Sequence, residues 1–197
     1  MTNRIAVLGG PRCGKTTLIQ QLYVEMKIIG LNVGYAFEYS TEYLRDKGMI
    51  ETISEQYGIY LGQKRLESKL SEFDYALTDY ATFVPYIYGR FMLGDKERTK
   101  KEIEILKDLY MLALEDLANY ETILYLPREF GYEKDGVRWQ DEEIAKEIDD
   151  AILTFLKSEN IKYMVVSGST KERASKILHH LNLEPVEDSV SSAFLKE

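Results

Sequence analysis

Short runs of apolar residues alternate along this chain with longer stretches in which apolar side chains recur every three to four positions. The short runs predict β-strands, and the periodic stretches predict helices that bury one face. Strands are expected at 5–8, 32–37, 75–78, 122–126 and 162–167. Helices are expected at 17–29, 41–47, 54–73, 83–93, 96–119, 141–157 and, after Gly168, through about Leu181. This alternation predicts an α/β fold in which helices cover both faces of a parallel sheet.

Two of these helices have a predicted inner face. For 54–73 it consists of Tyr57, Leu61, Leu66, Leu70 and Phe73, although Gly58 and Gly62 weaken the helical pattern. For 96–119 it consists of Ile103, Leu106, Leu109, Tyr110, Ala113 and Leu117.

The chain shows no repeat, low-complexity tract or linker that would divide it. Its 197 residues are 45% hydrophobic, which suits one domain with a sizeable core, so we expect a single domain over 1–197. A polar, glycine-containing segment at about 127–140 interrupts the pattern after the fourth strand, and we interpret it as a lid.

The strongest motif lies between the first strand and the first helix. Gly9-Gly10-Pro11-Arg12-Cys13-Gly14-Lys15-Thr16 fits G-x-x-x-x-G-K-[ST], a loop whose backbone N–H groups surround phosphate oxygens at a helix N-terminus. Lys15 would reach the β- and γ-phosphates, and the Thr16 hydroxyl would ligate Mg²⁺. The residues expected to bind the nucleotide are Gly9, Gly10, Pro11, Arg12, Cys13, Gly14, Lys15, Thr16 and Thr17.

Charge and cysteine content limit the kinds of function and site that this chain can have. A net charge of −8 disfavours a broad nucleic-acid-binding surface but leaves room for a narrow basic cleft. Cys13 is the only cysteine, which excludes an internal disulfide and a cysteine-based metal site. No run approaches the roughly 20 apolar residues of a membrane span. We therefore expect a cytoplasmic protein without membrane contact, in the host cytoplasm if it is phage-encoded.

Acidic residues end two of the predicted strands. Ligands of parallel sheets bind beyond the carboxyl ends of the strands. Asp79 would there hold Mg²⁺ as a Walker-B aspartate, or instead cap the next helix, and Asp74 is a weaker rival. Glu38 would act as general base on an acceptor hydroxyl, or instead be a solvated strand end or the partner of Arg45.

Arginines supply the positive charge that phosphoryl transfer requires. Arg128 and Arg138 lie in the predicted lid, and one of them is expected to be catalytic. Arg90 is expected to meet the acceptor, with Tyr86 and Tyr88 as a stacking wall, and Arg173 to frame the nucleotide base. Taken alone, Arg128, Arg138 and Arg90 are each more typical of a surface charge.

Two absences argue against other nucleotide-dependent proteins. Tyr80, and not a glutamate, follows Asp79, whereas hydrolytic motors usually carry a glutamate there to polarise water. The Asn-Lys-x-Asp guanine reader of Ras-type GTPases does not occur. Transfer to a small acceptor is therefore favoured over mechanical work.

Several segments together resemble a known family. The residues 10–17, 37–44 and 77–79, and Gly136-Val137-Arg138 with Gln140, are similar to kinase-type ATPases near ribosylnicotinamide kinase and to phage-encoded relatives. The resemblance spans roughly Ile5 to Arg173. It implies a three-layer P-loop kinase fold with strand order 2-3-1-4-5, ATP and Mg²⁺ as cofactors, and a lid around Arg128 and Arg138. Glu38 resembles the glutamate that acts on the acceptor hydroxyl in deoxynucleoside kinases. Thr78-Asp79-Tyr80-Ala81 departs from the Asp-Thr-Asp of ribosylnicotinamide kinases, so their acceptor is not carried over.

The sequence thus predicts an ATP- and Mg²⁺-dependent kinase acting on a nucleoside, a nucleotide or a related metabolite. One alternative is a phage kinase that phosphorylates a modified base, such as 5-hydroxymethyluracil, in DNA. A second is a regulatory nucleotide-binding module without a small acceptor. The sequence leaves a homodimer open.

Overall fold

The structure, a computed structural model, describes residues 2–93, 99–129 and 142–183. Within these ranges the chain forms a five-stranded sheet in the order β2-β3-β1-β4-β5, and each neighbouring pair is parallel. The strands are β1 Asn3–Leu8, β2 Val33–Ala36, β3 Tyr75–Asp79, β4 Thr122–Tyr125 and β5 Met164–Val165. The predicted fold class and the strand order are confirmed.

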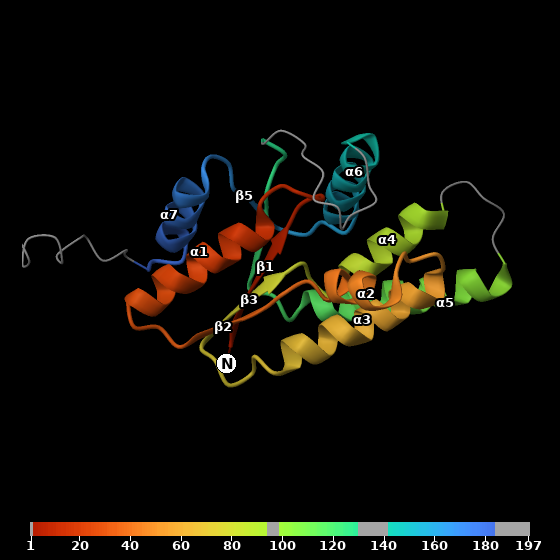
Figure 1. The fold of residues 1–197 in the computed structure, drawn as a ribbon, viewed down its shortest axis with the longest axis horizontal. Helices are drawn as coiled ribbons and strands as arrows, with labels where there is room; N and C mark the ends of the chain where they lie inside the picture. The colour runs from red at the N-terminus through yellow and green to blue at the C-terminus, as the bar shows by residue number, and fades with distance from the viewer. Residues whose placement is uncertain (1, 94–98, 130–141, 184–197) are drawn as a thin grey trace, which may run out of the picture.

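Helices cover both faces of this sheet (Figure 1). They are α1 Lys15–Ile28, α2 Tyr39–Lys47, α3 Ile53–Ser68, α4 Val84–Leu93, α5 Lys100–Leu117, α6 Glu142–Ser158 and α7 Thr170–His180. Helices α1 and α7 pack on one face, and α3 to α6 pack on the other. Helix α2 lies beside α3 and follows the end of β2.

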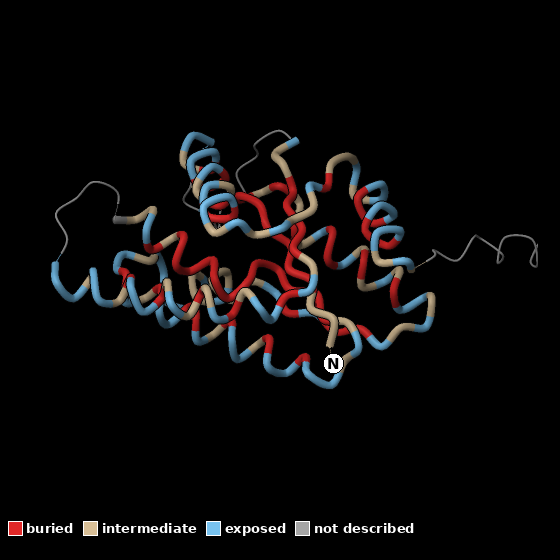
Figure 2. The backbone as a smooth tube through the Cα atoms, turned by 180° about the vertical axis from the view of Figure 1, so that it is seen from behind, coloured by how far each residue is buried: buried red, intermediate tan, exposed pale blue. Residues whose placement is uncertain are grey.

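The central strand β1 divides the core. Ile5 and Val7 pack with α1 and α7, whereas Ala6 and Leu8 pack into the aromatic-rich cluster under α3 to α6. All four side chains are fully buried, because successive residues of a strand point to opposite faces and both faces are covered here. Figure 2 shows this buried backbone running through the middle of the molecule.

The inner face predicted for 54–73 is confirmed only towards its end, where Leu70 is buried and Leu66 and Phe73 pack in the same cluster. Tyr57 and Leu61 are 38% and 51% exposed. The buried residues of the helix are instead Ile53, Gln56, Ile59, Tyr60, Gln63 and Glu67. Half of this face is polar, so hydrophobic side chains alone did not reveal it. The helix also ends at Ser68, before the predicted Phe73.

Helices α3, α5 and α7 begin at capping boxes. In α5, Thr99 accepts from the Glu102 backbone N–H while the Glu102 carboxylate accepts from the Thr99 N–H. Such reciprocal bonds satisfy backbone donors that have no partner within the helix. The inner face predicted for α5 is partly confirmed, since Leu106, Leu109 and Ala113 are buried but Ile103 is exposed.

Candidate active site

The loop between β1 and α1 has the geometry that its motif requires. Gly9 has φ +143° and Gly14, the N-cap of α1, has φ +88°, both in the region that favours glycine. A Cβ on Gly9 would lie 2.5 Å from the Cys13 sulfur and 2.6 Å from the Leu126 carbonyl oxygen. The strand–loop–helix setting predicted for a phosphate-binding loop is present.

Lys15 and Cys13 are buried inside this loop. The Lys15 ammonium donates to the Gly10 carbonyl at 2.9 Å and lies 4.3 Å from the centre of the Tyr80 ring. The Cys13 thiol also donates to the Gly10 carbonyl, at 3.1 Å. Burial raises the pKa of the Cys13 thiol, so it remains protonated at neutral pH.

The structure brings Thr16 and Asp79 together. Asp79 is the last residue of β3 and 1% exposed, and its carboxylate accepts a hydrogen bond from the Thr16 hydroxyl at the start of α1. A hydroxyl and a carboxylate side by side are the oxygen ligands that suit Mg²⁺. Asp74 precedes β3 and therefore lies at the amino ends of the strands, away from Thr16 and Asp79.

Glu38 lies at the same edge, between the end of β2 and the start of α2. Its carboxylate accepts hydrogen bonds from the hydroxyls of Ser40 and, at 3.2 Å, Thr41. We call the cavity beside it the polar pocket. It is lined by Thr16, Phe37, Glu38, Thr41, Glu42, Arg45, Leu66 and Asp79.

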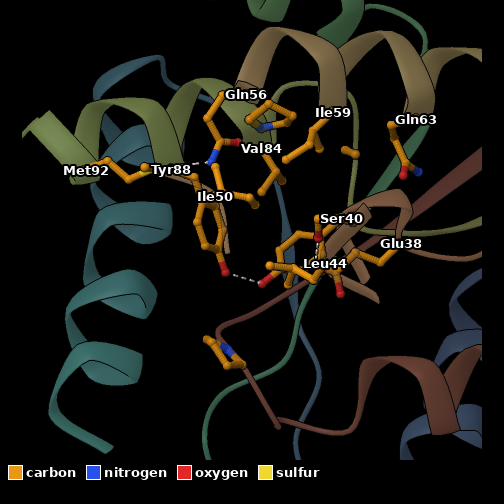
Figure 3. Close-up of a pocket in the computed structure, with 14 residues that line it drawn as sticks. Glu38, Ser40, Leu44, Ile50, Gln56, Ile59, Gln63, Val84, Tyr88 and Met92 are labelled. Carbon is orange, nitrogen blue, oxygen red and sulfur yellow. Dashed lines mark hydrogen bonds between the residues drawn. The ribbon is translucent and has the colours of Figure 1, made fainter. Parts of the chain in front are cut away.

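Glu38 also lines a second cavity, the apolar pocket, which lies between α2, α3 and α4 (Figure 3). It is lined by Pro11, Glu38, Ser40, Leu44, Ile50, Gln56, Ile59, Gln63, Tyr80, Ala81, Val84, Pro85, Tyr88 and Met92. The described residues that line this pocket include one acidic side chain, that of Glu38, and no lysine or arginine. The apolar pocket therefore suits a ring with few charges.

Two tyrosines form one side of the apolar pocket. The Tyr80 and Tyr88 hydroxyls are 3.1 Å apart, and their rings meet edge to face. Burial, and then the neighbouring Tyr80 and Glu38, raises the pKa of Tyr88 well above its usual value. Tyr88 therefore offers a neutral hydroxyl group to a ligand, and both tyrosines line the pocket with aromatic rings.

Comparison with known proteins identifies the family of this chain. A family model described as an AAA domain matches residues 4–173. The chain belongs to this AAA domain family. A search of curated proteins gave no match.

Solved structures similar to this AAA-domain chain include NadR protein, a deoxyadenosine kinase and thymidylate kinases. NadR protein in complex with NR is 18% identical, with a TM-score of 0.75, covering 95% of this chain and 54% of that one. Deoxyadenosine kinase from M. mycoides is 14% identical, with a TM-score of 0.67, covering 91% and 98%. Thymidylate kinase from Ehrlichia chaffeensis is 14% identical, with a TM-score of 0.64, covering 92% and 99%.

These identities establish the fold alone, which is that of P-loop nucleoside and nucleotide kinases. The AAA-domain chain spans about half the length of the NadR chains that it matches. The predicted resemblance to ribosylnicotinamide and deoxynucleoside kinases is confirmed at this level. No helix in the described part of the chain combines the length and apolar character needed to cross a membrane.

Two residues predicted to meet the acceptor lie elsewhere. Tyr86 is buried in the core, where its ring lies 5.0 Å from that of Tyr110 and 5.5 Å from that of Phe155, centre to centre. Arg90 is exposed and lines neither pocket. Tyr88, the other tyrosine of the predicted stacking wall, lies two residues after Tyr86 on another side of α4 and lines the apolar pocket.

Asp149 of α6 is a residue of the site that sequence reasoning missed. Its buried carboxylate accepts from the Gly10 N–H at 2.5 Å and from the Tyr125 hydroxyl at 3.2 Å. It also pairs with Arg128 at 3.0 Å, and Arg128 donates to the Ala145 carbonyl at 3.0 Å. Arg128 thus braces the loop through Asp149, and its catalytic role stays a prediction. Arg138 and most of the predicted lid lie outside the described residues.

Arg173 supports the loop from the other side. It is 1% exposed, and its guanidinium donates to the Cys13 carbonyl at 2.7 Å and pairs with Glu129 at 2.8 Å. The Glu129 carboxylate in turn accepts from the Gly168 N–H. These contacts tie α7 to the phosphate-binding loop, and the contact of Arg173 with a nucleotide base stays a prediction.

Proposed function

We propose that this AAA-domain chain is an ATP- and Mg²⁺-dependent phosphotransferase that phosphorylates a hydroxyl of a nucleoside-type acceptor bound in the apolar pocket. One observation carries the proposal. Glu38 lines both the polar pocket, which contains Thr16 and Asp79, and the apolar pocket between α2, α3 and α4. A carboxylate at that junction can face an acceptor hydroxyl and a phosphoryl donor together.

The loop and its neighbours would hold the nucleotide. Backbone N–H groups at the start of α1 bind phosphate oxygens, and Lys15 neutralises their charge. Thr16 and Asp79 would hold Mg²⁺, which when bound neutralises charge on the β- and γ-phosphates. In the ranges that the structure describes, no three His, Cys, Asp or Glu side chains are grouped for a metal. The remaining ligands would therefore be phosphate oxygens and water.

The apolar pocket favours a nucleoside over a nucleotide as acceptor. A monophosphate is doubly charged, and an uncompensated charge is costly to bury. No lysine or arginine occurs among the described residues that line this pocket. Tyr80 and Tyr88 can stack on a planar ring, and Gln56 offers an amide to its polar edge. Glu38 would accept the proton of the acceptor hydroxyl as the phosphoryl group is transferred.

The test is phosphoryl transfer from γ-labelled ATP to a panel of nucleosides and their 5′-monophosphates. We expect a labelled product with at least one nucleoside and none with the monophosphates. Lys15→Ala should abolish the reaction. Glu38→Gln should lower kcat about 100-fold or more while ATP still binds. If the protein hydrolyses ATP at a rate that no acceptor changes, the proposal is contradicted and a regulatory module is favoured.

A further inference from the structure

Helix α2, which begins directly after Glu38, is attached to α3 at its first residue. The Tyr39 ring lies against Gly62 so closely that a Cβ on Gly62 would be 2.1 Å from the Tyr39 Cε1 atom. The Tyr39 N–H donates to the side-chain oxygen of Gln63 at 2.9 Å. Both contacts involve consecutive residues of α3 and the residue adjacent to Glu38.

These contacts fix the first residue of α2, and one turn later the Tyr43 hydroxyl donates to Glu55 of α3 at 3.0 Å. None of its residues, Tyr39–Lys47, is buried. Its N-cap, Glu38, makes no side-chain capping bond, and the first N–H groups of any helix lack partners within the helix. Gln63 therefore caps α2 from a neighbouring helix.

Gln63 is itself fixed by a buried network. Its amide nitrogen donates to Glu67 at 3.1 Å, and the other Glu67 oxygen accepts from the Tyr120 hydroxyl at 2.8 Å. The Tyr120 oxygen accepts from the Thr82 N–H at 2.9 Å. Both ends of the Gln63 amide are thus bound to protein groups, although the residue lines the apolar pocket. Gln63 is therefore oriented toward Tyr39 without any ligand, in contrast to a residue whose side chain hydrogen-bonds the acceptor.

We propose that Gly62 and Gln63 are positioning residues that hold the start of α2, and with it the Glu38 carboxylate, in place for phosphoryl transfer. The proposal rests on the proposed function, because it assumes that Glu38 faces the acceptor hydroxyl. Gly62 and Gln63 would thus act on the catalytic rate through Tyr39 and Glu38. Displacing a reacting group by about 1 Å can cost about 100-fold in rate.

The first test compares Gly62→Ala with Gly58→Ala in the full chain. Both substitutions lie in α3, and both remove a helix-weakening glycine. A Cβ on Gly58 meets no atom within 4 Å, whereas one on Gly62 collides with the Tyr39 ring. We expect Gly62→Ala to lower kcat at least 10-fold, with unchanged ATP affinity, and to speed amide hydrogen exchange in 39–47. Gly58→Ala should match the wild type in all three.

The second test exchanges the polarity of the Gln63–Glu67 pair. Gln63→Leu removes the acceptor for the Tyr39 N–H and should lower kcat and loosen α2 as Gly62→Ala does. In the double variant Gln63→Glu/Glu67→Gln, the carboxylate at 63 can accept from both the Tyr39 N–H and the new amide at 67. We expect the double variant to recover protection of 39–47 and most of kcat.

The outcomes separate this proposal from the proposed function. A wild-type protein that transfers no phosphoryl group to any acceptor would overturn both. An active wild type with Gly62→Ala and Gln63→Leu equally active, or with unchanged exchange in 39–47, would overturn the positioning role alone. Loss of ATP affinity in parallel with kcat would also overturn it, because that pattern indicates general damage to the fold.

Discussion

Glu67 carries a carboxyl group into the protein interior, where it links Gln63 to Tyr120. Burial raises the pKa of Glu67 to about 7, although hydrogen bonds from Gln63 and Tyr120 act in the opposite direction. The folded protein therefore retains a proton between pH about 4.5 and about 7 that the unfolded chain has lost. The contribution of this group to stability falls as pH rises through that window.

Replacing Glu67 should remove this dependence. Glu67→Gln keeps the size of the side chain and resembles its protonated form. Urea unfolding at pH 5 and pH 8 should show that the variant gains stability relative to the wild type at pH 8 but not at pH 5. Parallel pH dependences for the two proteins would show that Glu67 is ionised as readily in the folded state as in the unfolded state.

Cys13 should be unreactive despite its place in the phosphate-binding loop. It is fully buried, burial raises its thiol pKa, and the thiolate is the form that reacts. We expect iodoacetamide at pH 8 to alkylate the native protein at least 10-fold more slowly than the urea-unfolded chain, as measured by mass spectrometry. Equal rates would contradict the burial of this side chain.

The location of a site residue could be predicted where it follows from the residue's position at the end of a parallel strand. Glu38 follows β2 and Asp79 ends the neighbouring strand β3, so their meeting at one edge of the sheet could be expected. Tyr86 and Tyr88 are tyrosines of one short helix, and only packing shows that Tyr86 points into the core while Tyr88 lines the apolar pocket.

Among the secondary-structure elements, α6 joins the loop to the rest of the protein through the Asp149–Arg128 pair. Asp149→Asn should destabilise the protein by about 3 kcal/mol, because it leaves the partly buried Arg128 charge without its partner. It should also weaken ATP binding, since Gly10 loses a charged acceptor. Denaturant unfolding and calorimetry measure the two effects.

Glu142→Gln is the matched control on the same helix. It removes an ion pair with Lys146 in which both side chains are more than half exposed, so stability should be nearly unchanged. Equal effects of Asp149→Asn and Glu142→Gln would show that the buried pair does not brace the loop.

The spacing of apolar residues predicted where the helices lie. It did not predict which polar residues lie on their buried faces. Asp149 shares a buried stripe with Ala145, Ile148 and Ile152, and this spacing was a usable signal. Gln56, Gln63 and Glu67 lie on the buried face of α3 in the same way. Polar side chains are normally assigned to solvent, and their partners, such as Tyr39 and Tyr120, come from distant parts of the sequence.

For the whole molecule, the sheet order places the phosphate-binding loop, Asp79 and Glu38 at one edge, with the apolar pocket beside them. That arrangement was predictable because the motif and the strand–helix alternation fix the topology. The pocket itself was not, because it is built from side chains of three helices whose packing no local pattern encodes.

The central claim is that this loop binds a nucleoside triphosphate. Titration calorimetry with a non-hydrolysable ATP analogue and Mg²⁺ tests it most directly. We predict saturable binding by the wild type at one site per chain, and binding at least 100-fold weaker for Lys15→Ala with its fold intact. A folded wild-type protein that takes up no ATP analogue in the presence of Mg²⁺ would contradict the account.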